Sequence, residues 1–301
     1  MSLTRFRDTP HTRDLPRQAK IVARIEPHAN LMSIEFLDAV TELVSRAAAV
    51  ILATDHSTLA VRRKADQSSV TTADLASQAV IAEGLARIAP ALRLVCEESA
   101  PTEMPTRLDR TFVLVDPLDG TREFIAGRNE FTVNVALVHE GVPILGVIAA
   151  PALGLVWRGG AGKGAERLRL APGLPPAQAS ERVAIATRLA ADDRLIAAIS
   201  RSHLDPATKA FLERLAPISQ LVCGSALKFC RIAEGAADIY PWLGPTSEWD
   251  VAAGHAIVAA AGGLVTNPHG QAVAYGRPEV RFVIPAFVAC GDPRLAAALR
   301  P

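Results

Sequence analysis

The chain has 301 residues, of which half are hydrophobic, and its 32 basic and 31 acidic residues give a formal net charge of +1. Such a length corresponds to one large domain or two of ordinary size. The apolar content excludes an intrinsically disordered chain, and the charge balance argues against binding of nucleic acid polymers through a globally basic surface. The four cysteines form no CxxC pair and lie among apolar neighbours, which is typical of buried thiols in a reducing compartment.

The N-terminal segment, residues 1–31, is polar and contains proline, and we expect it to form a flexible extension. No apolar run reaches the roughly 18–20 residues of a membrane span, and the start of the chain lacks the apolar core of a secretory signal. We therefore expect a cytoplasmic protein. The sequence leaves open its oligomeric state and a peripheral association with the inner face of the cell membrane.

In the first part of the chain, hydrophobic periodicity and turn residues predict two helices followed by five strands. In chain order these are helices 34–53 and 74–89 and strands 92–96, 111–115, 131–138, 144–149 and 154–158. The Gly- and Pro-rich stretch 159–176 is typical of a turn and linker. We therefore divide the chain there into an N-terminal α+β half, residues 32–176, and a C-terminal α/β half, residues 177–301.

Beyond that boundary, short apolar strands alternate with helices, which is typical of an α/β arrangement with a mostly buried sheet. The predicted elements are strands 183–186, 218–222, 237–240 and 281–284 and helices 191–199, 206–215, 225–234 and 250–261.

The strongest chemical feature is the hexapeptide DPLDGT at 116–121. The preceding strand ends at Asp116, and Asp119 follows three residues later. Two carboxylates at the end of a strand can converge on one cation, the carbonyl of Leu118 could add an oxygen, and such hard ligands suit Mg²⁺. The amides of Gly120 and Thr121 would lie at a helix N-terminus, where phosphate can bind. The alternative is an ordinary turn with Asp119 as a helix cap.

Further carboxylates stand at the ends of other predicted elements. Glu97 and Glu98 close a strand, and because adjacent side chains point to opposite sides of an extended chain, at most one of them can join a metal cluster directly. Asp250 and Asp74 each begin a helix, where capping is the common role of an aspartate. Asp250 could also reach the cluster, and Asp74 could accept a hydrogen bond from the Thr121 hydroxyl that orients water.

Together these segments resemble the inositol monophosphatases, a superfamily of Mg²⁺-dependent, lithium-sensitive phosphatases. The markers are Glu97-Glu98-Ser99, the DPLDGT run, and Trp249-Asp250 with Gly254. Within that superfamily the chain is most similar to the bacterial 3'(2'),5'-bisphosphate nucleotidases of the CysQ type, and the resemblance covers about residues 34–290. The segments that carry this closer similarity are 64–66, 70–74, 123–124, 130–134, 200–203, 224–230 and 244–256.

The resemblance implies an α/β fold, an α+β sandwich of alternating helix and sheet layers (αβαβα), and a cofactor of two or three Mg²⁺ ions. The implied metal ligands are Glu97, Asp116, the carbonyl of Leu118, Asp119 and Asp250. Asp74 and Thr121 would orient the attacking water, with Glu97 in the same catalytic group. The substrate-binding candidates are Gly120, Thr121, Arg122, Gly224, Ser225, Lys228, Arg201, His203 and Asp250, of which Arg201, His203 and Lys228 are the cations considered for a second phosphate.

Three positions depart from the pattern of that branch. Arg122 stands where Lys is usual, which keeps the positive charge. Ala226 replaces a second Ser and removes one hydrogen-bonding group. Trp242 stands where the branch often has Arg, and the loss of a cation near the mouth of the substrate site leaves the nucleotide preference open.

The resemblance implies a phosphomonoester hydrolase of sulfur metabolism that removes the 3'-phosphate of adenosine 3',5'-bisphosphate, with 3'-phosphoadenylyl sulfate as a further substrate. An inositol-1-phosphate or sugar phosphatase of the same fold is the alternative, and a non-catalytic nucleotide-binding protein is a remoter one. The sequence has neither a Cys-x5-Arg loop nor an Arg-His-Gly segment, which disfavours a covalent phosphoenzyme.

Overall fold

The computed structural model describes residues 31–55, 57, 59–63, 69–100, 102–190, 194–201, 204–215 and 217–295. Its helices are α2 (Ile34–Leu52), α3 (Thr72–Ile88), α4 (Thr121–Ile125), α5 (Pro206–Arg214), α6 (Leu227–Ala233) and α7 (Glu248–Ala260). Its strands are β1 (Val61–Arg63), β2 (Ser69–Thr71), β3 (Arg93–Cys96), β4 (Thr111–Asp119), β5 (Thr132–His139), β6 (Val142–Ala150), β7 (Leu155–Gly160), β8 (Gly164–Arg169), β9 (Glu181–Ile185), β10 (Leu195–Ser200), β11 (Ile218–Cys223), β12 (Ile239–Trp242), β13 (Thr246–Ser247), β14 (Leu264–Thr266), β15 (Val283–Ile284) and β16 (Phe287–Cys290).

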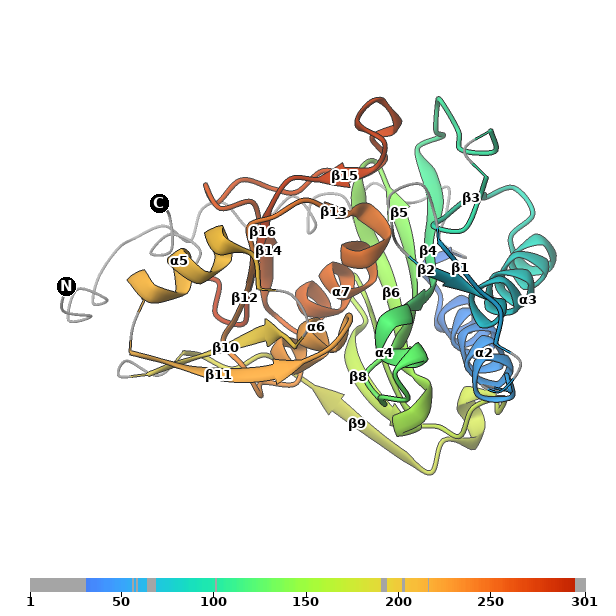
Figure 1. The fold of residues 1–301 in the computed structure, drawn as a ribbon, viewed down its shortest axis with the longest axis horizontal. Helices are drawn as coiled ribbons and strands as arrows, with labels where there is room; N and C mark the ends of the chain where they lie inside the picture. The colour runs from blue at the N-terminus through green and yellow to red at the C-terminus, as the bar shows by residue number, and fades with distance from the viewer. Residues whose placement is uncertain are drawn as a thin grey trace.

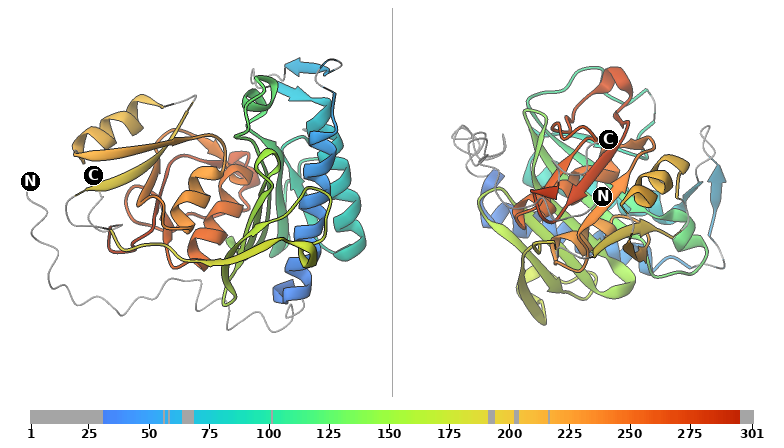
Figure 2. Two further views of the ribbon diagram at one scale, coloured as in Figure 1. Left: turned by 90° about the horizontal axis from the view of Figure 1, so that it is seen from below. Right: turned by 90° about the vertical axis from the view of Figure 1, so that its left-hand side faces the viewer.

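Helices and sheets alternate in five layers (Figures 1 and 2). Helices α2 and α3 cover one face of a seven-stranded sheet with the order β3-β4-β5-β6-β7-β8-β9. Helices α6 and α7 lie between that sheet and a five-stranded sheet with the order β11-β10-β12-β16-β14. Helix α5 covers the outer face of the second sheet. This arrangement confirms the predicted αβαβα fold.

The central strands are mostly apolar because both faces of the first sheet are covered. In β4, Val113 and Val115 pack in the cluster beneath α2 and α3, whereas Phe112 and Leu114 pack in the cluster around α6 and α7. Side chains that alternate between two buried layers leave no polar face. The strand therefore delivers its last residues, beginning at Asp116, to the edge of a rigid core.

Strand β8 corrects the prediction of a turn and linker over 159–176, because it is the sixth strand of the first sheet. The glycines there permit close packing: a Cβ on Gly159 would lie 2.9 Å from the Cβ of Ala260 in α7. Strand β9 pairs with β8 and extends the same sheet past residue 176.

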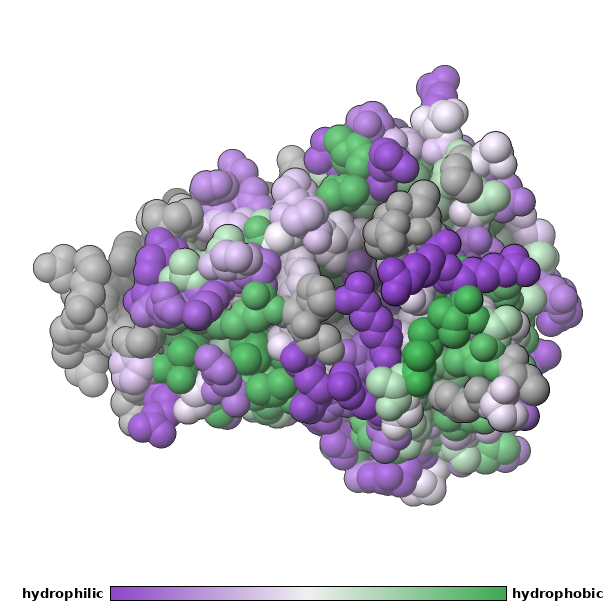
Figure 3. Space-filling model, in the orientation of Figure 1, coloured by the Kyte–Doolittle hydropathy of each residue, from purple (hydrophilic) through white to green (hydrophobic). Residues whose placement is uncertain are grey.

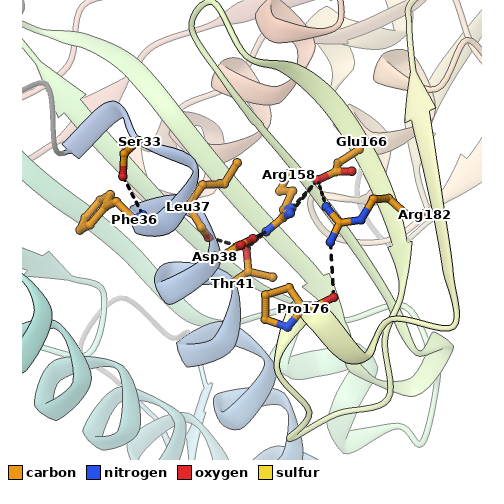
Figure 4. A network of polar contacts seen from close by, with 9 residues as sticks. All are labelled: Ser33, Phe36, Leu37, Asp38, Thr41, Arg158, Glu166, Pro176 and Arg182. Atoms are coloured by element: carbon orange, nitrogen blue, oxygen red, sulfur yellow. Dashed lines mark hydrogen bonds and ion pairs between the residues drawn. The ribbon is translucent and has the colours of Figure 1, made fainter.

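A buried arginine ties the edge of this sheet to α2 (Figure 4). Arg158 on β7 is 0 % exposed, and its guanidinium donates hydrogen bonds to Asp38 at 2.5 Å, to Thr41 at 3.0 Å and to Glu166 at 2.8 Å. Arg182 of β9 donates to the same Glu166 oxygen at 2.8 Å. The network therefore fastens β9 to the N-terminal part of the chain.

The predicted helix 191–199 is also wrong over its described part, since Leu195–Ser200 is strand β10. Ala197 and Ala198 are 0 % exposed, because the strand lies between two neighbours and is covered on both faces. Small apolar residues suit a helix by local propensity, and tertiary packing overrides that preference here. The predicted strand 281–284 is reduced to β15, because Arg281 and Phe282 adopt left-handed φ angles of 56° and 57°.

Residues 1–30, Lys64 and His203 lie outside the described residues, so the structure gives no account of the predicted extension or of those two side chains. Among the helices that are described, none is both long and apolar enough to cross a membrane.

Candidate active site

Three carboxylates from distant parts of the sequence meet at one edge of the first sheet. One oxygen each of Glu97, Asp116 and Asp250 lies within 4.8 Å of the others. Strands β3 and β4 are parallel neighbours, and the amide of Glu97 donates to the carbonyl of Val115 at 3.1 Å, so Glu97 lies beside Asp116. Asp250 comes from the first turn of α7. Glu98 is absent from this group among the described residues, in agreement with the prediction that only one of the pair would join it.

A break in the ladder between β4 and β5 shapes the DPLDGT turn. Asp116 pairs with Asn134, and Asp119 pairs with Thr132. Two residues of β4, Pro117 and Leu118, therefore lie opposite a single residue of β5, Val133. The amide of Leu118 donates to the Asp116 carboxylate at 3.0 Å. In a regular strand, residues three apart point to opposite faces, and this irregularity allows Asp119 to lie near Asp116.

Asp119 lies beside the three-carboxylate group and is not one of its members. Its Oδ2 accepts hydrogen bonds from Thr132 Oγ1 and from Asn134 Nδ2, each at 3.4 Å. Its charge is nevertheless close enough to raise the pKa of both Asp116 and Asp250.

Burial and mutual repulsion favour the protonated form of these acids in the absence of a cation. Desolvation is the first cause in each case: it raises the pKa of Asp250 to about 7 and that of Asp119 to about 6, and it raises the pKa of Asp116 well above its usual value. Neighbouring carboxylates add to the shift of Asp116 and of Asp250. A set of buried oxygen donors with excess negative charge fits a hard divalent cation such as Mg²⁺.

Asp74 and Thr121 are in contact, as the sequence predicts. Thr121 Oγ1 lies 3.2 Å from Asp74 Oδ1 and 3.2 Å from the Leu118 carbonyl oxygen. Burial raises the pKa of Asp74, while hydrogen bonds from Thr71 and Thr121 lower it. The negative charge of Glu97 also contributes to the raised pKa of Asp74, so the Asp74–Thr121 pair lies near the carboxylate group.

Gly120 makes the junction between β4 and α4 possible. Its φ angle is 90°, and a Cβ there would lie 2.1 Å from Ser225 Oγ. Ser225 Oγ in turn lies 2.9 Å from the carbonyl oxygen of Asp119 and 2.8 Å from the carbonyl oxygen of Glu130. This contact joins the DPLDGT turn to the segment that precedes α6.

A cavity of about 220 Å³ opens beside the carboxylates. It collects most of the predicted substrate-side residues and several that the sequence did not single out. Its lining is Asp119, Gly120, Arg122, Glu123, Ser200, Gly224, Ser225, Ala226, Lys228, Phe229, Tyr240, Trp242, Thr246 and Asp250. On the surface, hydrophilic side chains gather where α4 approaches β10 and β11, with apolar patches to either side (Figure 3).

Lys228 brings a buried cation to this cavity. Its Nζ donates to the Ser225 carbonyl oxygen at 2.6 Å and lies 5.2 Å from the centre of the Tyr240 ring. Burial lowers the pKa of Lys228, and the nearby Asp119 charge opposes that shift. The ammonium group can therefore compensate part of the negative charge that a phosphate would bring.

Arg201 is placed differently from the prediction. Its guanidinium forms two hydrogen bonds with the Glu130 carboxylate, at 2.7 and 2.8 Å, and it is not among the residues that line the cavity. Glu130 also accepts from the Gly224 amide at 3.0 Å. Glu130 is thus a residue that sequence reasoning did not assign to the site, although it begins the segment 130–134 that carries part of the family resemblance.

Comparison with known proteins agrees with this fold. A model of the inositol monophosphatase family matches residues 33–299, and the chain belongs to that family. Within it, the chain is 40% identical over 253 residues to the 3'(2'),5'-bisphosphate nucleotidase CysQ of Shigella flexneri. The aligned region covers 83% of this chain and 98% of that relative.

Solved structures give the same grouping. CysQ from Bacteroides thetaiotaomicron superposes with a TM-score of 0.70 at 31% identity and covers 85% of this chain and 96% of its own. An inositol monophosphatase from Anabaena superposes with a TM-score of 0.68 at 26% identity and covers 88% of this chain and 93% of its own.

Proposed function

We propose that the protein is a Mg²⁺-dependent phosphomonoester hydrolase that removes the 3'-phosphate of adenosine 3',5'-bisphosphate. Family membership and the identity of about 40% to relatives named as bisphosphate nucleotidases support this function. The observation that carries it is the Asp74–Thr121 pair, in which Asp74 lies close enough to Glu97 of the carboxylate group for the Glu97 charge to raise its pKa.

The chain offers a complete set of oxygen donors for the metal. Glu97, Asp116, Asp250, Asp119 and the Leu118 carbonyl would hold two or three Mg²⁺ ions. When bound, Mg²⁺ lowers the pKa of water and offsets the charge that builds on the phosphate oxygens. Phosphoryl transfer depends mainly on positioning and charge stabilisation, and the donor set and the cavity cations supply both.

The hydroxyl of Thr121 would orient the attacking water. When Asp74 Oδ1 accepts a hydrogen bond from the Thr121 hydroxyl, the lone pairs of Thr121 Oγ1 are free to accept a hydrogen bond from water. That hydrogen bond would direct the water oxygen toward phosphorus without a covalent phosphoenzyme. Side chains that are positioned to assist proton transfer contribute about 10²–10⁴-fold to rate, and we expect the loss of this pair to fall in that range.

The phosphate and the nucleoside would occupy the adjoining cavity. The amides of Gly120 and Thr121 would bind the scissile phosphate, and Arg122 would add a positive charge at the mouth. Lys228 would face the second phosphate, with Gly224 and Ser225 beside it. Arg201 would contact the substrate from its ion pair with Glu130, and His203 remains a prediction from the sequence.

Product analysis of the purified chain tests this function. Adenosine 3',5'-bisphosphate should give adenosine 5'-monophosphate and one equivalent of phosphate, with Mg²⁺ required, and Asp116→Asn should abolish turnover. 3'-Phosphoadenylyl sulfate should lose its 3'-phosphate in the same way. Release of the 5'-phosphate, or full activity in the presence of a chelator, would contradict the proposal.

The second candidate is an inositol-1-phosphate or sugar phosphatase. The observation in its favour is the fold itself, which the inositol monophosphatase of Anabaena shares. A substrate panel separates the two, because that candidate predicts that sugar or inositol phosphates are turned over at least as well as the nucleotide.

A further inference from the structure

The cavity wall includes three aromatic side chains, Phe229, Tyr240 and Trp242. Phe229 and Tyr240 are 1 % and 7 % exposed and pack edge to face with ring centres 4.9 Å apart. Their ring faces are thus occupied by the protein interior. Trp242 is only partly buried and packs against the edge of the same core. Of the three, it offers the most aromatic surface to a ligand.

The indole of Trp242 is held in place before any ligand arrives. Trp242 is the last residue of β12, and its backbone pairs with Phe287 of β16. The indole Nε1 donates to the Pro245 carbonyl oxygen at 3.4 Å. These contacts restrain the indole, and a restrained ring loses less conformational freedom on binding than a free side chain does, which favours affinity.

The charge pattern of the cavity determines what this ring can contact. Arg122 and Lys228 can meet phosphate groups, and Asp119 and Asp250 belong to the metal side. The indole carries no charge, and its one N–H is already engaged. Its flat apolar surface therefore suits a flat, weakly polar part of the ligand, and in a nucleotide bisphosphate that part is the base.

We propose that Trp242 is the specificity-determining residue that stacks on the nucleobase of the substrate. This inference rests on the proposed nucleotidase function and assigns the base, rather than a phosphate, to this end of the cavity. Stacking of a base on an aromatic side chain is sequence-tolerant. Adenine and guanine bisphosphates should accordingly be bound with similar affinity.

The first experiment compares Trp242→Ala and Trp242→Phe with the parent chain on adenosine 3',5'-bisphosphate and on glycerol 2-phosphate, which has no base. In Trp242→Ala, the ratio of kcat/KM for the nucleotide to that for glycerol 2-phosphate should fall about 5- to 150-fold, the range typical of a lost base stack. The change should lie in KM, and Trp242→Phe should recover most of it. An unchanged ratio, or no recovery by Phe, would overturn the inference.

The second experiment measures binding without turnover. Adenosine 5'-monophosphate should quench the tryptophan fluorescence of the parent chain, and Trp242→Phe, which keeps Trp157 and Trp249, should lose that quenching. Equal quenching in both proteins would refute the stacking role. A parent chain that hydrolyses sugar phosphates and leaves the nucleotide intact would refute the proposed function, and the quenching would still decide where the base binds.

Discussion

Two carboxylates of the proposed site also have a structural task, because each of them caps a helix. Asp74 and Asp250 are the third residues of α3 and α7, and both complete capping boxes, with Thr71 and Ser247. In each, Oδ2 accepts the capping hydrogen bonds, from Thr71 in one case and from Thr246 and Ser247 in the other. The cap fixes the side chain, and Oδ1 is the oxygen that the cap does not use. Capping and a site role are alternatives in the sequence, and the structure shows that the cap leaves one oxygen of each carboxylate available for the proposed site role.

The water-orienting role of Thr121 predicts a loss of kcat with little change in KM. Thr121→Val keeps the shape of the side chain and removes the hydroxyl, so kcat should fall about 10²–10⁴-fold. Thr121→Ser keeps the hydroxyl and should retain most of the activity. Steady-state kinetics at saturating Mg²⁺ check this, and a Val variant with the parent's kcat would exclude the role.

The raised pKa values predict a pH-dependent stability of the metal-free protein. The pKa of Asp250 rises from 3.8 to about 7 on folding, and that of Asp119 to about 6. Between the unfolded and folded values the folded state binds more protons, so the free energy of unfolding falls as pH rises from about 4 to about 7. Mg²⁺ binds the ionised form and should oppose this loss.

Urea unfolding at pH 5 and pH 7.5, with a chelator and with excess Mg²⁺, measures the effect. The decrease between the two pH values should be larger with the chelator. Asp250→Asn, which keeps an oxygen for the helix cap, should reduce the decrease in the chelated protein. The same decrease in this variant and in the parent would show that the carboxylates do not cause it.

At the scale of elements, the turn between β4 and α4 depends on one glycine. A residue with a side chain at Gly120 would meet both a left-handed φ of 90° and Ser225 Oγ. Gly127 is a matched control, because its φ is 65° and nothing lies within 4 Å of its added Cβ. Gly127→Ala should cost about 1–2 kcal/mol of stability from its φ alone.

Gly120→Ala should cost more than this control and should also lower kcat/KM, because the Ala side chain displaces Ser225 and the DPLDGT turn. Urea unfolding and kinetics on both variants test the difference. Equal stability and equal activity of the two variants would show that the contact with Ser225 contributes neither to stability nor to kcat/KM.

The N-terminus of α7 is held by a buried acid that the sequence did not mark. Glu248 is 0 % exposed, and its carboxylate accepts from the amides of Gly276 at 2.6 Å and Arg277 at 3.0 Å. Glu248→Ala should cost about 1–3 kcal/mol by leaving those amides unpaired, and it should weaken Mg²⁺ binding because Asp250 lies in the same turn. Glu279→Ala, on the exposed part of that segment, is the control. Calorimetric Mg²⁺ titration would contradict this role if both variants bound the ion as the parent does.

Sequence reasoning succeeded where one local pattern determined one element. The periodicity of α2 and the hairpin of β5 and β6 were recovered, since each is defined by its own residues. It failed at β8 and β10, where glycines that permit close packing looked like a linker and buried alanines looked like a helix. It also could not find the Glu130–Arg201 pair, because that contact depends on how two distant segments meet.

At the scale of the whole molecule, the near-zero net charge hides a separation of charges. Glu97 and Asp116 come from the N-terminal part of the chain and Asp250 from the C-terminal part, and they meet only in the folded protein. Lys228 and Arg122 line the cavity beside them. The fold therefore brings a cluster of carboxylates and two basic side chains together where the two parts of the chain meet.

The central claim is that this junction hydrolyses a nucleotide bisphosphate in preference to other phosphomonoesters. The ratio of kcat/KM for adenosine 3',5'-bisphosphate to that for inositol 1-phosphate, measured at the same Mg²⁺ concentration, tests it most directly. We predict a ratio of about 100 or more, because the base and the second phosphate each add interactions that the inositol lacks. A ratio near or below one would contradict the assignment.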